Sequence, residues 1–291
     1  MKIGVQLPEV ERFVPWPEYR RMAVIAEEGG LDSLWVGDHL LYDLPDGSTR
    51  GPWECWSLLA SLAAVTSRVQ LSPLVASTSF HSPAMLAKQA ATVDAISGGR
   101  LILSLGAGWN RREYEAFGFP YDHRVSRFAE AFTIIRTLIR HGSIDFDGEY
   151  HTLSNCVLDP PARPDLPLLV GSSGPRMLEI TMPHVNAWNI WFDDYDNDPT
   201  LLPERLAVVN RAAEAAGRDP SDIDLTAALL VNLAGTPERH NSRNPVVGED
   251  AAREALAALG EAGITHVQLV LDPITVETVE IATGLVNGHQ A

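Results

Sequence analysis

Short apolar runs alternate with longer helix-like stretches along the whole sequence. Eight runs read as strands, at residues 2–7, 33–37, 69–75, 101–105, 168–170, 187–191, 223–233 and 266–271. A helix is predicted after each run, at residues 17–30, 53–67, 82–96, 126–140, from 175, 203–216, 249–262 and 276–286. Eight strand–helix units in succession are typical of a (β/α)8 TIM barrel. We therefore expect one α/β barrel domain over residues 1–291.

Two segments interrupt this alternation. The Asp147-Gly148 pair inside residues 144–158 predicts a β-hairpin inserted after the fourth helix. Residues 236–248, after the seventh strand, are polar and predict an exposed loop. A doubly wound sheet is the alternative architecture, but the first strand is not followed by a glycine-rich GxGxxG turn. The barrel is the better prediction.

Composition narrows the class of partner. The 291 residues carry 22 basic and 38 acidic side chains, a net charge of −16. Such a charge argues against nucleic acid or an anionic membrane as the main partner. The two cysteines, Cys55 and Cys156, form no CxxC pair, and the first residues show no apolar signal sequence. A small-molecule substrate and a reducing cytoplasm are expected.

The carboxyl ends of barrel strands carry the functional residues in such folds. Asp38 and His39 follow the second strand, and histidine exchanges protons near neutral pH. The alternative is that Asp38 caps a loop and His39 is a satisfied core group. Ser77 follows the third strand and offers a hydroxyl to a ring edge or to a turn.

A glycine turn follows the fourth strand. Gly106 and Gly108 permit close approach of the backbone to a flat ligand, and Trp109 could wall it. The turn could equally be a tight bend with a buried tryptophan. We place His39 and Trp109 together at the reacting centre.

A second glycine turn follows the fifth strand and begins a helix. Small residues and free N–H groups at a helix start form a phosphate cradle. Here it would consist of Gly171, Ser172, Ser173 and Gly174, with Arg176 adding charge. An ordinary strand–helix turn is the alternative. No metal site is expected, because the aspartates at 193–198 lack the glycine and distal glutamate of a calcium loop.

These motifs together resemble the bacterial-luciferase-like superfamily of flavin- and deazaflavin-dependent oxidoreductases. The matching stretches are GLDSLWVGDHL, the long segment from ECWSLLASLAAV to NRREYEAFGFP, RFAEAF and LPLLVGSSGPRML, which cover most of residues 1–190. The resemblance implies a cofactor ring over the strand ends. It also implies a non-prolyl cis peptide at Leu74–Val75 or its neighbour behind that ring, a phosphate on Ser172–Gly174, and a homodimer through the second and third helices.

The resemblance leaves two cofactors open. Coenzyme F420 carries hydride, and the Asp38-His39 pair with Trp109 is closer to that branch, so F420-dependent hydride transfer is our first expectation. Asp38 and Ser77 would position the ring, and His39 would exchange the substrate proton. An FMN-dependent monooxygenase using reduced flavin and oxygen is the alternative, and a non-catalytic flavin-binding barrel is the third reading.

The resemblance also limits the substrate. Trp109 stands where a sugar-phosphate dehydrogenase of the deazaflavin branch has a catalytic glutamate, so a sugar phosphate is not expected. Residues 45–51, 144–158 and 236–248 would select the substrate.

Overall fold

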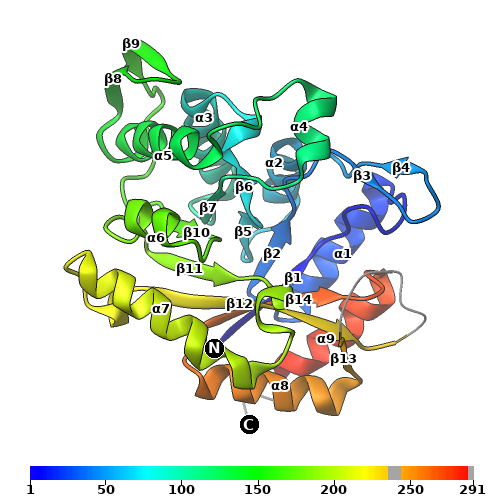
Figure 1. The fold of residues 1–291 in the computed structure, drawn as a ribbon. Coiled ribbons are helices and arrows are strands. Elements are labelled where there is room, and N and C mark those ends of the chain that lie inside the picture. The colour runs from blue at the N-terminus through cyan, green and yellow to red at the C-terminus, as the bar shows by residue number, and fades with distance from the viewer. Residues whose placement is uncertain (235–243, 288–291) are drawn as a thin grey trace.

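The eight expected strands form the wall of a barrel (Figure 1). The computed structural model describes residues 1–234 and 244–287. The wall strands are β1 (Lys2–Gln6), β2 (Ser33–Val36), β5 (Gln70–Pro73), β7 (Leu103–Gly106), β10 (Leu168–Val170), β11 (Ala187–Ile190), β12 (Asp224–Asn232) and β14 (His266–Leu271). They are parallel and lie in the order β5-β2-β1-β14-β12-β11-β10-β7. Their near-continuous apolar sequences fit strands that are buried on both faces.

The helices lie outside this wall (Figure 1). They are α1 (Trp16–Glu28), α2 (Cys55–Val65), α3 (Pro83–Ser97), α5 (Arg124–His141), α6 (Pro175–Thr181), α7 (Leu202–Ala215), α8 (Glu249–Glu261) and α9 (Val276–Asn287). The first ends at Glu28, two residues before the predicted end at residue 30, with Gly29 as its C-cap. Among the helices of the described ranges, none is long and apolar enough to cross a membrane.

The barrel closes between β5 and β7 through a broken strand. Leu71 pairs with Leu101 just before β7, and β6 (Ala76–Ser77) then pairs with β7 itself. Between these two pairings lies the cis peptide Leu74–Val75. Both the TIM-barrel fold and the position of the non-prolyl cis peptide are therefore confirmed.

The inserted hairpin is also present. Strands β8 (Ser143–Asp147) and β9 (Thr152–Val157) pair in antiparallel fashion. Glu130 on α5 accepts hydrogen bonds from the N–H groups of Glu149, Tyr150 and His151 and so ties the turn to the barrel. In the predicted loop 236–248, residues 236–243 lie outside the described residues. The short β13 (Val246–Val247) that follows them pairs with β12.

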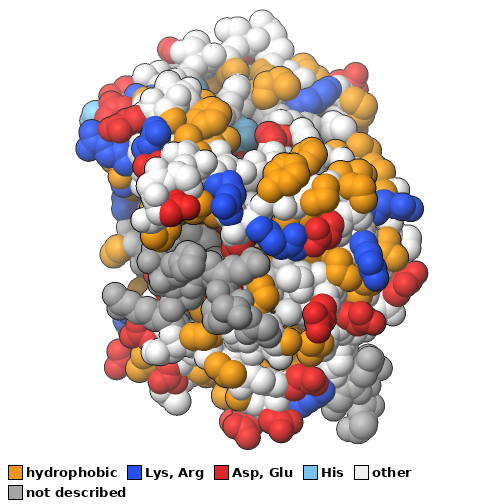
Figure 2. Space-filling view, turned by 90° about the vertical axis from the view of Figure 1, so that its right-hand side faces the viewer, with side chains coloured by type: hydrophobic (Ala, Val, Ile, Leu, Met, Phe, Trp, Pro, Cys, Tyr) orange, Lys and Arg blue, Asp and Glu red, His pale blue; other side chains and the backbone are white. Residues whose placement is uncertain are grey.

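Sequence reasoning missed two elements that bear on the site. Strands β3 (Tyr42–Asp43) and β4 (Thr49–Arg50) form a small hairpin after β2. Helix α4 (Arg111–Phe117) follows β7 and begins at the cap residue Asn110, whose side chain accepts from the N–H of Arg112. Figure 2 views the side on which β3 and β4 lie, where apolar side chains are mixed with acidic and basic ones.

A buried histidine lies at the amino-terminal end of the barrel strands. His266, the first residue of β14, lies 2.6 Å from the Ser33 hydroxyl through Nε2 and packs edge-on against Trp35. The Trp35 indole N–H donates to the same hydroxyl. Burial, with a smaller contribution from the positive charges of Lys2 and the N-terminus, lowers the pKa of His266 to about 3.

The fold should therefore lose stability in mild acid. An unfolded histidine binds its proton near pH 6.5. Neutral His266 thus contributes fully to the free energy of unfolding above that pH. As the pH drops from about 6.5 toward 3, this contribution falls by up to about 1.4 kcal/mol per pH unit. Urea unfolding at pH 7 and pH 5 should show a smaller loss in His266→Asn than in the wild type. The exposed His123→Gln control should behave like the wild type; an equal loss in His266→Asn would contradict the assignment.

Candidate active site

A cavity of about 1020 Å³ opens at the carboxyl ends of the strands. Loops after β1, β2, β5, β7, β10 and β11 all contribute to its wall. Its lining includes Glu9, Val10, Glu11, Asp38, His39, Tyr42, Asp43, Leu44, Pro45, Asp46, Arg50, Leu74, Val75, Ser77, Phe80, Gly106, Ala107, Gly108, Trp109, Glu113, Gly171, Ser172, Met177, Asn189, Trp191, Phe192, Asp193 and Asp194. This volume is at the upper end of the range for small-molecule and cofactor sites.

Most of the predicted site residues meet in this cavity. Asp38, His39, Leu74, Val75, Ser77, Gly106, Gly108, Trp109, Gly171 and Ser172 all line it. Ser173 and Gly174 are exposed beside Ser172 and are not part of the lining. Arg176 also lies outside it, where its guanidinium pairs with Glu179 at 2.6 Å on the surface.

Asp38 fixes the segment that carries Ser77. Its carboxylate is buried, and Oδ2 accepts hydrogen bonds from the backbone N–H of Ser77 and from Nε2 of His81, both at 2.8 Å. A buried carboxylate is stable only when such donors satisfy it. Asp38 thus holds β6 against the end of β2, rather than presenting both oxygens to a ligand.

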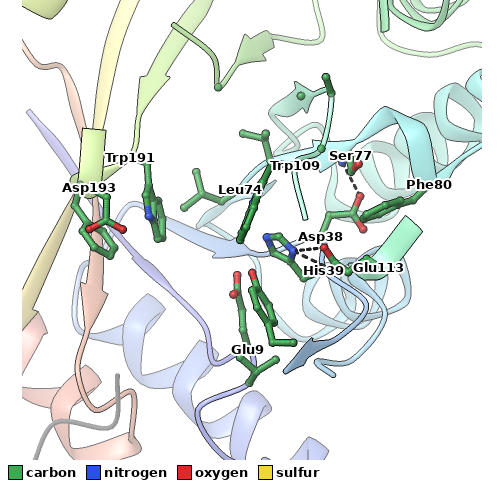
Figure 3. A pocket seen from close by; sticks show the side chains of 18 of the residues that line it. Glu9, Asp38, His39, Leu74, Ser77, Phe80, Trp109, Glu113, Trp191 and Asp193 are labelled. Carbon is green, nitrogen blue, oxygen red and sulfur yellow. Dashed lines mark hydrogen bonds and ion pairs between the residues drawn. The ribbon is translucent and has the colours of Figure 1, made fainter. Parts of the chain in front are cut away.

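His39 is held by a carboxylate that sequence reasoning did not identify. Its Nδ1 lies 3.1 Å from each carboxylate oxygen of Glu113, a side chain with no exposed surface. The other ring nitrogen is turned away from Glu113, toward the space between Trp109 and Glu9 (Figure 3). Burial lowers the pKa of His39. The Glu113 hydrogen bond and the charges of Glu9, Glu113 and Asp38 outweigh that effect, and the net pKa is raised.

Aromatic rings surround this nitrogen. The His39 ring lies 4.8 Å from that of Tyr42 and 5.9 Å from that of Trp109, measured between centroids. Trp109 remains 63% exposed, so it stands at the rim of the cavity rather than in the core. A partly open aromatic wall leaves room for a flat molecule beside the imidazole.

Val75 explains two of the glycines. A Cβ atom at Gly106 would lie 2.7 Å from Cγ2 of Val75, and one at Gly171 would lie 2.9 Å from Cγ1. These glycines therefore make space for a side chain of the broken strand, and both also line the cavity. Gly108 is different, because its φ is +73° and an added Cβ would clash with both the Tyr114 hydroxyl and Ser77 Oγ.

One hydroxyl of the wall has no partner among the described residues. Ser77 is 4% exposed, and its Oγ makes no hydrogen bond. An unpaired buried hydroxyl is costly, so a polar ligand atom at this position would stabilise it.

The segments expected to select the substrate contribute unequally. Pro45, Asp46 and Arg50 of the first segment line the cavity. No residue of the 144–158 hairpin belongs to the described lining. Most of the third segment lies outside the described residues.

The fold and cavity can be compared with known proteins. The model of the luciferase-like monooxygenase family matches residues 2–268. The chain belongs to this family. It is therefore a luciferase-like oxidoreductase, as the resemblance implied.

Two curated relatives carry the same name. The pyrimidine monooxygenase RutA of Cronobacter sakazakii is 32% identical over 244 residues, covering 79% of this chain and 70% of that protein. RutA of Pseudomonas syringae is 30% identical over 241 residues, covering 79% and 66%. The chain thus spans about two-thirds of the length of these relatives.

Solved structures confirm the fold. An F420-dependent secondary alcohol dehydrogenase superposes with a TM-score of 0.82 at 20% identity, covering 98% of this luciferase-like chain and 97% of the other. An EDTA monooxygenase from Chelativorans sp. BNC1 superposes with a TM-score of 0.78 at 16% identity, covering 98% and 92%.

The contact of Val75 with the glycines generates a prediction. Gly106→Ala should lower the free energy of unfolding by about 1–3 kcal/mol, because the new methyl group overpacks Val75. Val75→Ala should recover part of that loss, giving a non-additive double-mutant cycle in urea. Gly174→Ala serves as control, because its Cβ would meet only Ser172 Oγ, at 3.9 Å. Strict additivity of the first two changes would refute the contact.

Proposed function

We propose that this protein is a flavin-dependent monooxygenase, which binds reduced FMN at the strand ends and oxygenates a small organic substrate. The observation that carries the proposal is the cavity, which joins an aromatic wall, the unpaired Ser77 hydroxyl and the cavity-facing nitrogen of His39. The RutA relatives, at 30–32% identity, favour the monooxygenase over F420-dependent hydride transfer.

The residues present fit a flavin. Leu74 and Val75 offer an apolar surface to one face of a planar ring, and Ser77 offers a hydrogen bond to its polar edge. Ser172 at the cavity wall, with the exposed Ser173 and Gly174 beside it, would receive the phosphate. Arg176 would have to leave Glu179 before it could add its charge.

When bound, reduced FMN supplies the electrons that activate oxygen. The protein supplies the surroundings of that reaction. Trp109, Trp191 and Phe192 restrict the entry of water from the rim. His39 holds one proton on Nδ1 against Glu113 and delivers another from Nε2 to the substrate.

The relatives also suggest a first substrate to test, a pyrimidine base. The protein should take up oxygen when mixed with reduced FMN and uracil, and one atom from ¹⁸O₂ should appear in the product by mass spectrometry. Reduced F420 serves as the comparison. Hydride transfer from F420 without incorporation of ¹⁸O would replace the monooxygenase assignment by the dehydrogenase. Binding of either cofactor without turnover of a broad substrate panel would favour the non-catalytic barrel.

Ser77 should contribute to flavin affinity. Loss of one hydrogen bond to the ring costs about 1 kcal/mol, so Ser77→Ala should weaken the binding of reduced FMN about fivefold. Anaerobic fluorescence titration measures this change. Ser61→Ala removes a hydroxyl from α2, where it bonds only to the Ser57 carbonyl, and should leave the affinity unchanged. Equal affinities for wild type and Ser77→Ala would remove Ser77 from the site.

A further inference from the structure

Glu113 is buried in a place where a carboxylate needs several donors. Its side chain has no exposed surface, and it comes from α4, which follows β7. Oε1 accepts the backbone N–H of Leu40 at 2.5 Å and that of Leu41 at 3.4 Å. Both oxygens also face His39 Nδ1. The carboxylate therefore binds the segment after β2 through the backbone and the imidazole at the same time.

The segment after β2 and helix α4 form one unit. Besides the Glu113 contacts, the Asn110 side chain donates to the carbonyl of Leu41, and Arg112 Nε donates to Asp43. These bonds fix the position of α4 relative to His39. The distance from Glu113 to the imidazole is therefore set by the surrounding backbone and does not depend on a flexible surface side chain.

We propose that Glu113 is a positioning residue, which keeps a proton on Nδ1 of His39 and aims Nε2 of the same ring into the cavity. A carboxylate only accepts hydrogen bonds, so Nδ1 must be the donor in this pair. Since the second partner of a histidine decides its tautomer and orientation, Nε2 is left for the ligand side. Figure 3 shows this nitrogen directed away from Glu113.

A purely structural carboxylate would have a different effect. The backbone N–H groups of Leu40 and Leu41 could satisfy part of Glu113 without any effect on the imidazole. Glu130 illustrates that case, because it accepts three backbone N–H groups of the β8–β9 turn and no side-chain donor in the described contacts. Glu113 differs because it places a negative charge against a ring that faces the cavity.

Other charges around His39 must be considered with Glu113. Within the described residues, the charges of Glu9, which follows β1, and of Asp38, which precedes His39 in the chain, also favour the imidazolium. Tyr42 and Trp109 contribute aromatic rings next to the imidazole. Asp38 is itself bonded to His81 and the Ser77 N–H. Glu113 is the carboxylate in direct hydrogen-bond contact with the imidazole, and its hydrogen bond favours the imidazolium more than the charge of Glu9 does.

The test separates charge from shape. Glu113→Gln keeps an oxygen for the Leu40 N–H but loses the negative charge. The His39 titration, followed by NMR of the ring Cε1–H signal and assigned with His39→Gln, should move at least about one pH unit lower. Glu113→Asp keeps the charge, so its His39 titration should lie closer to that of the wild type than to that of Glu113→Gln. Glu130→Gln, the matched control, should leave the His39 titration unchanged.

Turnover provides the second measurement and rests on the proposed function. In Glu113→Gln, kcat should begin to fall on the alkaline side of its pH profile at a lower pH than in the wild type, because His39 loses its proton at a lower pH. The KM for the substrate should stay within about twofold of the wild-type value. An unchanged His39 titration in Glu113→Gln, or the same shift in Glu130→Gln, would overturn the assignment. Should Glu113→Gln fail to fold, ¹⁵N NMR of the wild-type His39 ring provides the test, because a neutral ring with its proton on Nε2 rather than Nδ1 would overturn the assignment. The NMR titration needs no flavin, so failure of the monooxygenase proposal would leave this result readable.

Discussion

The packing of Val75 between Gly106 and Gly171 lets the chain pass from β5, which pairs with β2, to β6, which pairs with β7. The chain leaves β5, passes the cis peptide Leu74–Val75, and resumes as β6 on β7. The Val75 side chain then occupies space that a Cβ at Gly106 or Gly171 would need. Because β7 ends in Gly106 and Gly171 directly follows β10, the barrel can close here, and Ser77 is brought to the mouth of the cavity.

Buried carboxylates hold the rest of the mouth together. Asp38 binds β6 through the Ser77 N–H, and Glu113 binds the segment after β2 through the Leu40 N–H. An acidic chain can bury such groups because backbone N–H donors satisfy them. The consequence for chemistry is that negative charge collects around His39, the one imidazole of the described cavity lining. In our proposal, the same side chains therefore support the structure and hold the proton of His39.

The family fixes the fold and class of this protein, while in our proposal the residues around His39 decide its chemistry. Proteins that catalyse very different reactions share this barrel. The alcohol dehydrogenase and the EDTA monooxygenase are examples, at 20% and 16% identity to this chain. A shared scaffold with loops that differ is expected when function resides at the strand ends. The β3–β4 hairpin and α4, which are joined through Asp43 and Arg112, form a side of the mouth that belongs to the loops and not to the wall.

The sequence alone determined the barrel, its strands, the inserted hairpin and the position of the cis peptide, because these follow from local periodicity and from a specific family resemblance. It also located Asp38, His39, Ser77 and Trp109 at strand ends. It could not find Glu113, although Asn110 three residues earlier is a helix-cap signal. A contact between residues 39 and 113 depends on how two loops fold over the barrel. The roles of the glycines likewise came only from tertiary structure, since a sequence shows where a side chain is missing but not which neighbour fills the space.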